Sequence, residues 1–154
     1  MSSAGVGTFT FTTALNSTPY FIVVKSDNTI ETWSAAAQSF TSGALSYNFS
    51  TSAAQAYGGN MTQKGSAWCI FSGEVAKDVT NIIDASDMTA VDNDNTYSNN
   101  NPVTDLNGDN IVDASDLTIT DNNNTYAISR MAPSGAPMAK RVMRPDISPK
   151  QNIK

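Results

Sequence analysis

The sequence of 154 residues contains no histidine and a single cysteine, Cys69. Without histidine there is no Ser-His-Asp or Cys-His nucleophile arrangement and no metal site with histidine ligands. One cysteine forms neither an intramolecular disulfide nor a thiolate zinc site, and Cys69, in an apolar stretch, is expected to be a small core residue. Charged residues are also scarce, at 15% against roughly 25% in an average soluble protein. These absences favour a protein that is not an enzyme.

Long apolar runs are absent too. No run approaches the roughly 18 residues of a membrane-spanning helix, and residues 1–6 lack the basic and apolar regions of a signal peptide. We therefore expect no membrane insertion. A strand pattern begins by Thr8 without a lead-in, so we interpret the chain as a mature or processed form whose missing signal says little about location. The basic residues after position 127 lack the aromatic neighbours of a nucleic-acid module, so no nucleic-acid partner is expected.

The formal net charge of −5 is unevenly distributed. Residues 74–121 hold eleven Asp or Glu and one basic residue, Lys77, which gives this stretch a charge of −10. Residues 127–154 hold six Lys or Arg against Asp146, a charge of +5, together with four of the six prolines. So many carboxylates in one stretch repel one another unless cations lie among them. The Pro-rich basic end is predicted to be an extended tail.

The chain divides into three parts: a β-domain (7–73), a repeat region (74–126) and the tail (127–154). In the β-domain, stretches with the composition or period-2 alternation of β-strands lie at residues 8–12, 20–24, 29–33, 45–49 and 67–71. Turn residues separate them. The fold class expected is therefore mainly β, with a small antiparallel β-sandwich in this domain. About 65 residues bury barely enough apolar surface to be stable alone.

The repeat region contains two copies of one motif with an offset of 29 residues. The stretch 81–97 matches 110–126 at twelve of seventeen positions, and both copies contain Asp-Ala-Ser-Asp. Calcium binds six to eight oxygen ligands, so oxygen-bearing groups at regular spacing in a twelve-residue loop predict a calcium site. In the second copy such groups stand at positions 1, 3, 5, 7, 9 and 12: Asp105, Asn107, Asp109, the Ile111 carbonyl, Asp113 and Asp116.

Further expectations for this loop follow from residue type. Asn110 stands where glycine is usual in calcium loops, and asparagine tolerates the left-handed conformation better than most residues. Val112 should point inward, and Leu117 and Ile119 should begin a short helix after the loop. The alternative is an Asp-rich turn that is merely solvated. Five correctly spaced oxygen side chains within a repeated unit argue against that alternative.

The second loop resembles the duplicated calcium loop of dockerin modules, whose loops run Asp-x-Asn-x-Asp and end in Asp. The resemblance implies that its six oxygen-bearing residues are calcium ligands, with Asp113 acting through water. The first copy departs from this pattern, because residues 74–80 lack the Asn and are two residues too long; Asn81 is a possible substitute oxygen. Its other candidate ligands are Glu74, Asp78, Asp84 and Asp87. Whether the first copy binds a second, weaker calcium ion is left open.

A wider resemblance covers residues 7 to about 128. The strings at residues 16–20, 30–34, 57–61 and 68–73 are similar to modules on secreted bacterial surface proteins. In those modules a transthyretin-like or carboxypeptidase-regulatory-like β-sandwich runs directly into a dockerin-like calcium pair. The chain departs from the family at its front, so we expect the first one or two strands of that sandwich to be missing and its edge to be incomplete. The resemblance implies adhesion, display or assembly, and no enzymatic activity.

These observations predict an extracellular or cell-surface structural protein that binds calcium and assembles with copies of itself into a filament, tube or surface layer through exchanged strands or tails. A sheet that lacks an edge strand exposes backbone groups that a neighbour's segment can fill. The tail should lie across another subunit, with Ile128 and Met131 among its apolar anchors. The alternative function is a dockerin-type module that docks onto a cohesin-like partner. A glycosidase is disfavoured because the carboxylates cluster at calcium-loop spacing.

Overall fold

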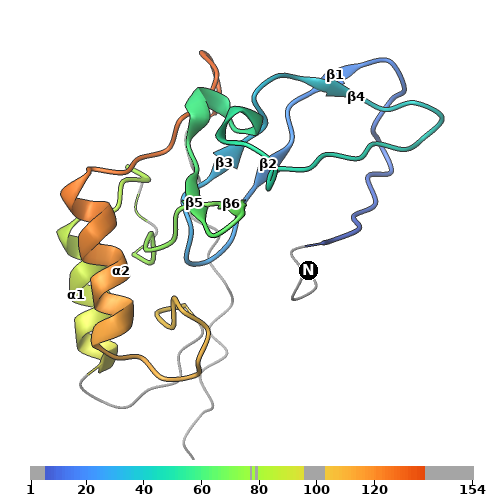
Figure 1. The fold of residues 1–154 in the computed structure, drawn as a ribbon. Coiled ribbons are helices and arrows are strands. Elements are labelled where there is room, and N and C mark those ends of the chain that lie inside the picture. Colours follow the sequence, from blue (N-terminus) through green and yellow to red (C-terminus); the bar gives the residue numbers. More distant parts are fainter. Residues whose placement is uncertain (1–5, 77, 79, 96–102, 138–154) are drawn as a thin grey trace, which may run out of the picture.

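The computed structural model of the chain describes residues 6–76, 78, 80–95 and 103–137 (Figure 1). A β half (residues 6–73) comes first, and a helical half (residues 74–126) follows it. The elements in chain order are β1 Pro19–Tyr20, β2 Val23–Val24, β3 Thr32–Trp33, β4 Gln38–Ser39, the 3₁₀ helices η1 Ala53–Gln55 and η2 Tyr57–Gly59, β5 Thr62–Lys64, β6 Ala67–Cys69, α1 Ala85–Asn95 and α2 Ala114–Thr125. Short antiparallel strands and two helices are therefore present, as the sequence predicts.

The strands of the β half form three separate two-stranded antiparallel pairs. Strand β1 pairs with β4, β2 with β3, and β5 with β6. Among the described residues no sheet has a third strand, so these strands do not build the two packed sheets of a sandwich. The ladder between β2 and β3 is short because it ends at Ser34. There the Ser34 hydroxyl accepts the Ile22 N–H at 3.0 Å, where a continuing ladder would use the backbone carbonyl.

Two of the five predicted strand stretches remain unpaired. Residues 20–24, 29–33 and 67–71 contribute to the strand pairs, whereas residues 8–12 and 45–49 form no ladder with any described residue. The alternation within 45–49 is nevertheless kept, because its odd-numbered side chains are partly buried and its even-numbered ones are exposed. A sequence pattern sets which side chains face inward, but a ladder also requires a neighbouring strand in register.

The apolar core of the β half is small. Its buried apolar side chains are Ile30, Trp33, Ala56 and Met61, with exposed fractions from 0% to 9%. Cys69 is a free, partly buried cysteine. Four buried apolar side chains are few for a unit of about 70 residues, since a chain of that size already buries little surface for its length.

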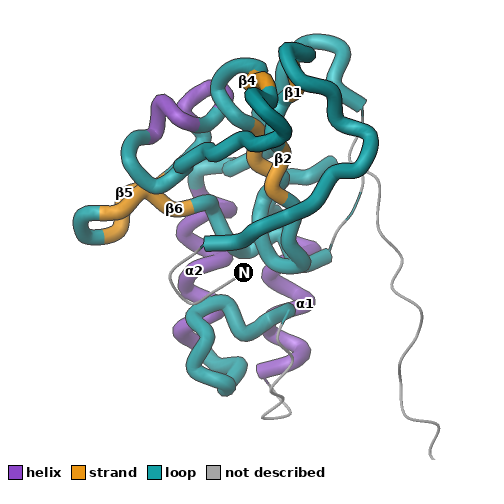
Figure 2. Tube along the Cα trace, turned by 90° about the vertical axis from the view of Figure 1, so that its right-hand side faces the viewer, coloured by secondary structure: helices purple, strands orange, loops and turns teal. Residues whose placement is uncertain are grey.

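Helices α1 and α2 lie side by side and run antiparallel (Figures 1 and 2). Val75, Val91 and Val112 form the buried core of this half, and Leu106 and Leu117 pack against it. Val112 is 1% exposed, so it points inward as expected. The helix expected to begin at Leu117 after the second loop is present as α2, but it begins at Ala114, within the loop, because Asp113 caps it. In the described ranges neither helix has the length and apolar character needed to cross a membrane.

Gly73 joins the two halves and lies against α2 at Thr120. Its φ is 117°, and a Cβ at this position would lie 3.4 Å from both the Thr120 Cα and the Ile83 Cγ2. Glycine therefore suits both the backbone conformation and the space. The Asn123 side-chain amide donates to the Ser72 carbonyl at 2.7 Å and ties the end of α2 to the same junction.

Residues 127–137 return from the end of α2 to the β half (Figure 1). The Ile128 carbonyl accepts the Ile83 N–H at 2.9 Å. The Ser129 carbonyl accepts a hydrogen bond from the Asn60 side-chain amide at 2.8 Å. These bonds connect the chain after α2 to both the first loop and the β half.

Met131 also contacts its own chain, because it lies over Gly58. A Cβ added to Gly58 would meet the end of the Met131 side chain, and the φ of 65° at Gly58 favours glycine at this position. Residues 127–137 thus contact their own chain, and the expectation that the tail lies across another subunit stays a prediction. Their backbone carbonyls and the Met131 side chain find partners within the same chain. The rest of the tail, residues 138–154, lies outside the described residues.

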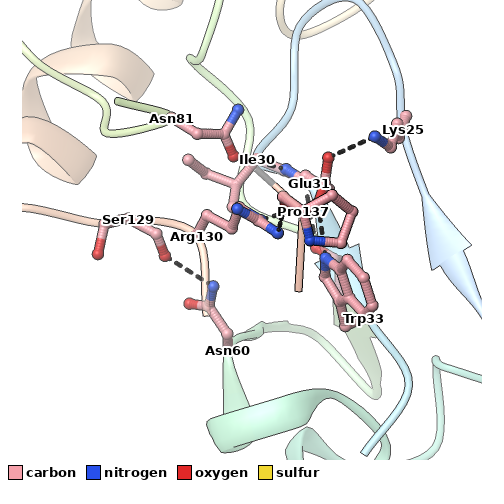
Figure 3. A network of polar contacts seen from close by, with 10 residues as sticks. Lys25, Ile30, Glu31, Trp33, Asn60, Asn81, Ser129, Arg130 and Pro137 are labelled. Carbon is pink, nitrogen blue, oxygen red and sulfur yellow. Dashed lines mark hydrogen bonds and ion pairs between the residues drawn. The ribbon is translucent and has the colours of Figure 1, made fainter. Parts of the chain in front are cut away.

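An ion cluster centred on the buried Glu31, next to β3, holds this returning segment against the β half (Figure 3). The Glu31 carboxylate pairs with Lys25 Nζ at 2.7 Å and Arg130 Nε at 2.8 Å, and it accepts a hydrogen bond from Trp33 Nε1 at 2.6 Å. The Arg130 guanidinium lies 5.5 Å from the centre of the Trp33 ring and donates to the Pro137 carbonyl at 2.6 Å. Burial alone would raise the pKa of Glu31, but the hydrogen bonds from Lys25 and Trp33 and the charge of Arg130 outweigh it and lower the pKa.

Candidate metal centre

Asp116, in the first turn of α2, is a buried side chain that binds the backbone of the second loop. Its residue is 0% exposed, and its carboxylate accepts three backbone N–H groups: Leu106 at 2.6 Å, Asn107 at 3.0 Å and Asp113 at 3.0 Å. The helix begins after Asp113, whose side chain accepts the Ser115 N–H at 2.7 Å. Asp113 and Asp116 form a capping box, which satisfies backbone donors that the first helical turn leaves unpaired.

Asp105 stabilises the turn on the opposite side of the second loop. Its carboxylate accepts the N–H groups of Gly108 at 2.7 Å, Asp109 at 3.2 Å and Asn110 at 3.0 Å. The turn contains two residues with positive φ, Gly108 at 80° and Asn110 at 69°. Asn110 therefore adopts the left-handed conformation that the sequence predicts for the usual glycine position.

Asn107 and Asp109 connect this turn to the start of α2. The Asn107 side-chain oxygen accepts the Asp109 N–H at 2.8 Å, and its NH₂ group donates to Asp109 Oδ2 at 3.0 Å and to Ser115 Oγ at 2.8 Å. Asp109 in turn accepts the Ile111 N–H at 2.9 Å. Residues 107–111 are all exposed, so this side of the loop faces solvent.

The first loop repeats the same construction around Asp87. Asp87 is 1% exposed and accepts the N–H groups of Val75 at 2.7 Å, Ala76 at 2.8 Å and Asp84 at 2.9 Å. Asp84 accepts the Ser86 N–H at 2.8 Å, as Asp113 does with Ser115 in the second copy. The repeat in the sequence is thus also a repeat of four equivalent backbone hydrogen bonds.

These bonds set the register of the first loop. The two residues that follow Glu74 bond to Asp87 as the two residues that follow Asp105 bond to Asp116. Glu74 therefore occupies the position equivalent to Asp105, at the beginning of its loop. The environments differ, because Glu74 is 1% exposed and Asp105 is only partly buried. The two additional residues of the first loop lie after position 76.

Asn81 and Asp78 have local structural roles in the first loop. Asn81 has a φ of 50°, like Asn110 in the second copy, but its side-chain oxygen accepts the Glu31 N–H at 3.1 Å. That oxygen is directed to the β half, which corrects its interpretation as a substitute ligand. Asp78 accepts hydrogen bonds from the Thr80 hydroxyl and, at 2.7 Å, from the Thr80 N–H, and these bonds lower the pKa of Asp78.

The donor set of the second loop suits a hard cation in its chemistry, because every candidate ligand is an oxygen and the turn at Asp105 wraps the loop upon itself. In the part of the chain that the structure describes, however, no three Asp, Glu or Cys side chains are grouped so that they could hold a metal ion. The carboxylates accept N–H groups instead, and a carboxylate oxygen has lone pairs for more than one bond. Calcium binding stays a prediction for both loops.

The buried acceptor role of Asp87 and Asp116 has a signal in the sequence that the interpretation as calcium ligands overlooks. In each copy an aspartate at the start of a helix is followed three residues later by a second aspartate, as in a capping box. The same spacing of aspartates is therefore compatible with a calcium loop and with a helix capping box that needs no metal ion.

The two loops lie at opposite ends of the antiparallel helix pair (Figure 1). Residues 74–84 lie beside the β half, whereas residues 103–113 lie at the far end of the helices. Comparisons with models of known protein families, with curated proteins and with solved structures find no match to this chain.

Proposed function

We propose that this chain is a non-catalytic structural subunit, located outside the cell or at its surface, that assembles with copies of itself into a filament, tube or layer and binds calcium through its acidic loops. The observation that carries the proposal is the open β half. Among the described residues its strands form only two-stranded pairs, and its apolar core is small. Association with further copies would bury apolar surface that a single chain leaves exposed.

Exposed large apolar side chains are concentrated in one short segment of the β half. Val6, Phe9, Phe11 and Leu15 lie within ten residues of sequence and are each 65% to 67% exposed. Single exposed apolar residues are ordinary at a protein surface, but several in one short segment indicate an interaction site. This segment supports assembly more directly than the charge distribution of the chain does.

Calcium has an electrostatic role in this proposal. Residues 74–121 carry a charge of −10, and two bound ions would reduce it to −6. The ion would supply positive charge and link side chains of one loop. In the second loop the residues to hold it are Asp105, Asn107, Asp109, the Ile111 carbonyl, Asp113 and Asp116. In the first loop they are Glu74, Asp78, Asp84 and Asp87.

The pKa directions and hydrogen bonds of the carboxyl groups support a role without catalysis. A general acid needs a carboxyl group with a raised pKa, so that it carries a proton at neutral pH. In Asp113 the hydrogen bonds from the Ser115 hydroxyl and N–H lower the pKa, and Thr80 does the same for Asp78. The buried carboxylates of Asp87 and Asp116 serve the backbone of their loops.

Size-exclusion chromatography and negative-stain imaging test the proposal, with the purified chain in calcium, in magnesium and in chelator. We expect polymers that grow with protein concentration. Calcium should raise the melting temperature of the helical half, because saturation at 100 times the dissociation constant stabilises a folded state by about 2.7 kcal/mol. The β half should keep its fold in chelator, since its core is apolar. A chain that stays monomeric at all concentrations, with the same melting curve in calcium and chelator, would contradict the proposal.

A dockerin-type module with a cohesin-like partner is the second candidate. One observation favours it: Ser86 and Thr89 on α1 are exposed, and so are Ser115 and Thr118 at the equivalent positions of α2. Two equal polar patches at the helix starts would suit a partner that binds either copy. This candidate predicts a calcium-dependent complex of one chain with a cohesin-like domain, and monomers in its absence.

A further inference from the structure

Two stretches with a strand pattern make no backbone hydrogen bond to any described residue, namely residues 8–12 and residues 45–49. Backbone N–H and C=O groups in folded proteins are normally paired, and an unpaired strand edge is a template for another segment. The two stretches are equal in length. In residues 8–12 the apolar side chains are exposed, whereas in residues 45–49 the apolar side chains are partly buried and only the backbone lacks a partner among the described residues.

Residues 8–12 leave their apolar face uncovered. Phe9 and Phe11 alternate with three threonines, so both rings project from the same side of the extended chain. They are 67% and 65% exposed. Phe11 makes an edge-to-face contact with Phe40, with ring centres 6.4 Å apart. Figure 1 shows this blue segment at the margin of the molecule, away from the three strand pairs.

Residues 45–49 leave their backbone edge uncovered and keep their apolar face inward. Leu45, Tyr47 and Phe49 are partly buried. The Tyr47 hydroxyl donates to the Gln55 carbonyl at 2.5 Å, and the rings of Tyr47 and Phe49 pack edge to face with centres 4.8 Å apart. Side chains thus hold this segment in place, while its backbone makes no hydrogen bond to any described residue and bends at Phe49.

We propose that residues 8–12 of one copy add as a β-strand to residues 45–49 of the next copy. This inference rests on the self-assembly proposed above and names the contact that produces it. Pairing would complete the backbone hydrogen bonds of both stretches, which are each about 17 Å long at 3.3–3.4 Å per residue. Phe9 and Phe11 would lie on the face of Leu45, Tyr47 and Phe49, where cross-strand aromatic and aliphatic pairs stabilise a sheet. The threonines would share the solvent face with Ser46 and Asn48.

The partner is a second copy because the two stretches make no backbone hydrogen bond to each other within one chain. Asn16 is fixed beside the turn before residue 45, since its side chain accepts the Gly43 N–H at 2.8 Å. From that point residues 8–12 and 45–49 of the same chain continue without bonding to each other. A neighbour offers the same edge with no need for the segment to fold back. A contact between two different surfaces then repeats from copy to copy and forms an open chain or ring.

Disulfide cross-linking between differently labelled chains tests this contact. In a Cys69→Ser background, one chain carries Thr10→Cys and the other carries Asn48→Cys or Ser46→Cys, so that any mixed disulfide joins two copies. Oxidised glutathione should give the mixed dimer on a non-reducing gel. The control pair, Thr10→Cys with Ser134→Cys, should give at least about tenfold less, because Ser134 lies outside the proposed edge and is exposed. Equal yields from both pairs would contradict the strand contact.

The double variant Phe9→Ser and Phe11→Ser tests the energetics of the same contact. Its critical concentration for assembly should rise roughly 100-fold, from the loss of two apolar side chains at the contact. Tyr126→Ser, which removes an aromatic ring that is 78% exposed elsewhere, should leave assembly unchanged. If the double variant assembles like the wild type, this inference fails while self-assembly stands. If a chain with both Thr10→Cys and Asn48→Cys instead closes an internal disulfide as a monomer, the segment pairs within its own chain and the inference is overturned.

Discussion

Asp116→Asn separates a structural role of the second loop from a metal-binding one. It removes the charge from a buried carboxylate that accepts three backbone N–H groups. Asparagine keeps the size of the side chain, but only one of its two terminal groups accepts hydrogen bonds. If its oxygen faces Leu106 and Asn107, its NH₂ group faces the N–H of Asp113, and two donors then oppose each other.

We expect this substitution to lower the free energy of unfolding by about 3 kcal/mol. A hydrogen bond to a charged group contributes roughly 1.5–3 kcal/mol, so losing the bond from Asp113 costs about 2 kcal/mol. The bonds from Leu106 and Asn107 survive with a neutral acceptor, and neutral bonds have roughly half the strength of charged ones, which adds about 1 kcal/mol. The total is a large fraction of the roughly 5–15 kcal/mol that stabilises a typical domain.

Urea denaturation in chelator, followed by circular dichroism, measures this loss without any contribution from calcium. Asp87→Asn should cost a similar amount, because Asp87 accepts the three equivalent N–H groups of the first copy. Asp121→Asn is the matched control, since it makes the same charge change at an exposed position of α2 and should stay within about 0.5 kcal/mol of wild type. An unchanged midpoint for Asp116→Asn in chelator would refute the capping role.

Glu31→Gln should destabilise the chain by about 3 kcal/mol in urea, because it leaves the buried Arg130 without its counterion, whereas Lys25→Met should cost under about 1 kcal/mol because Lys25 is 54% exposed. The folded-state pKa of Glu31 lies below its ordinary value of 4.5, so the native state binds fewer protons there and stability should fall as the pH drops from about 5 through the folded-state pKa. Glu31→Gln should reduce that fall, and parallel pH curves for variant and wild type would contradict it. Asp105→Asn should weaken calcium binding at least about tenfold in isothermal titration calorimetry, and an unchanged affinity would remove Asp105 from the ligand set.

The helical half is more predictable from the sequence than the β half, because its signals are local. The inward position of Val112 and the presence of a helix in the second copy depend on a few neighbouring residues, and the structure contains both; α2 begins at Ala114, three residues before the predicted start at Leu117. Strand pairing depends on partners that are distant in the sequence. Residues 8–12 and 45–49 therefore have the correct alternation but no ladder within the described chain.

The contacts that join the β half to the rest of the chain cannot be predicted from the local sequence. Glu31 and Arg130 lie far apart in the sequence, and neither has a neighbour that marks it as half of an ion pair. The proline content of the tail predicts an extended chain, but it does not say which surface that chain covers. Asn81 shows the same limit, since its residue type fits a ligand and its backbone position directs it to Glu31 instead.

The two loops offer calcium different access. In the first loop Glu74 and Asn81 are buried, and the Asn81 oxygen is bonded to the β half, so an ion there would have to displace existing contacts. In the second loop residues 107–111 are exposed, at the end of the helix pair farther from the β half (Figure 1). Calcium is therefore expected to act mainly at that far end, whereas the proposed contact between copies lies in the β half. Chelation should loosen the helices and leave strand-linked polymers intact, because neither strand segment belongs to a loop.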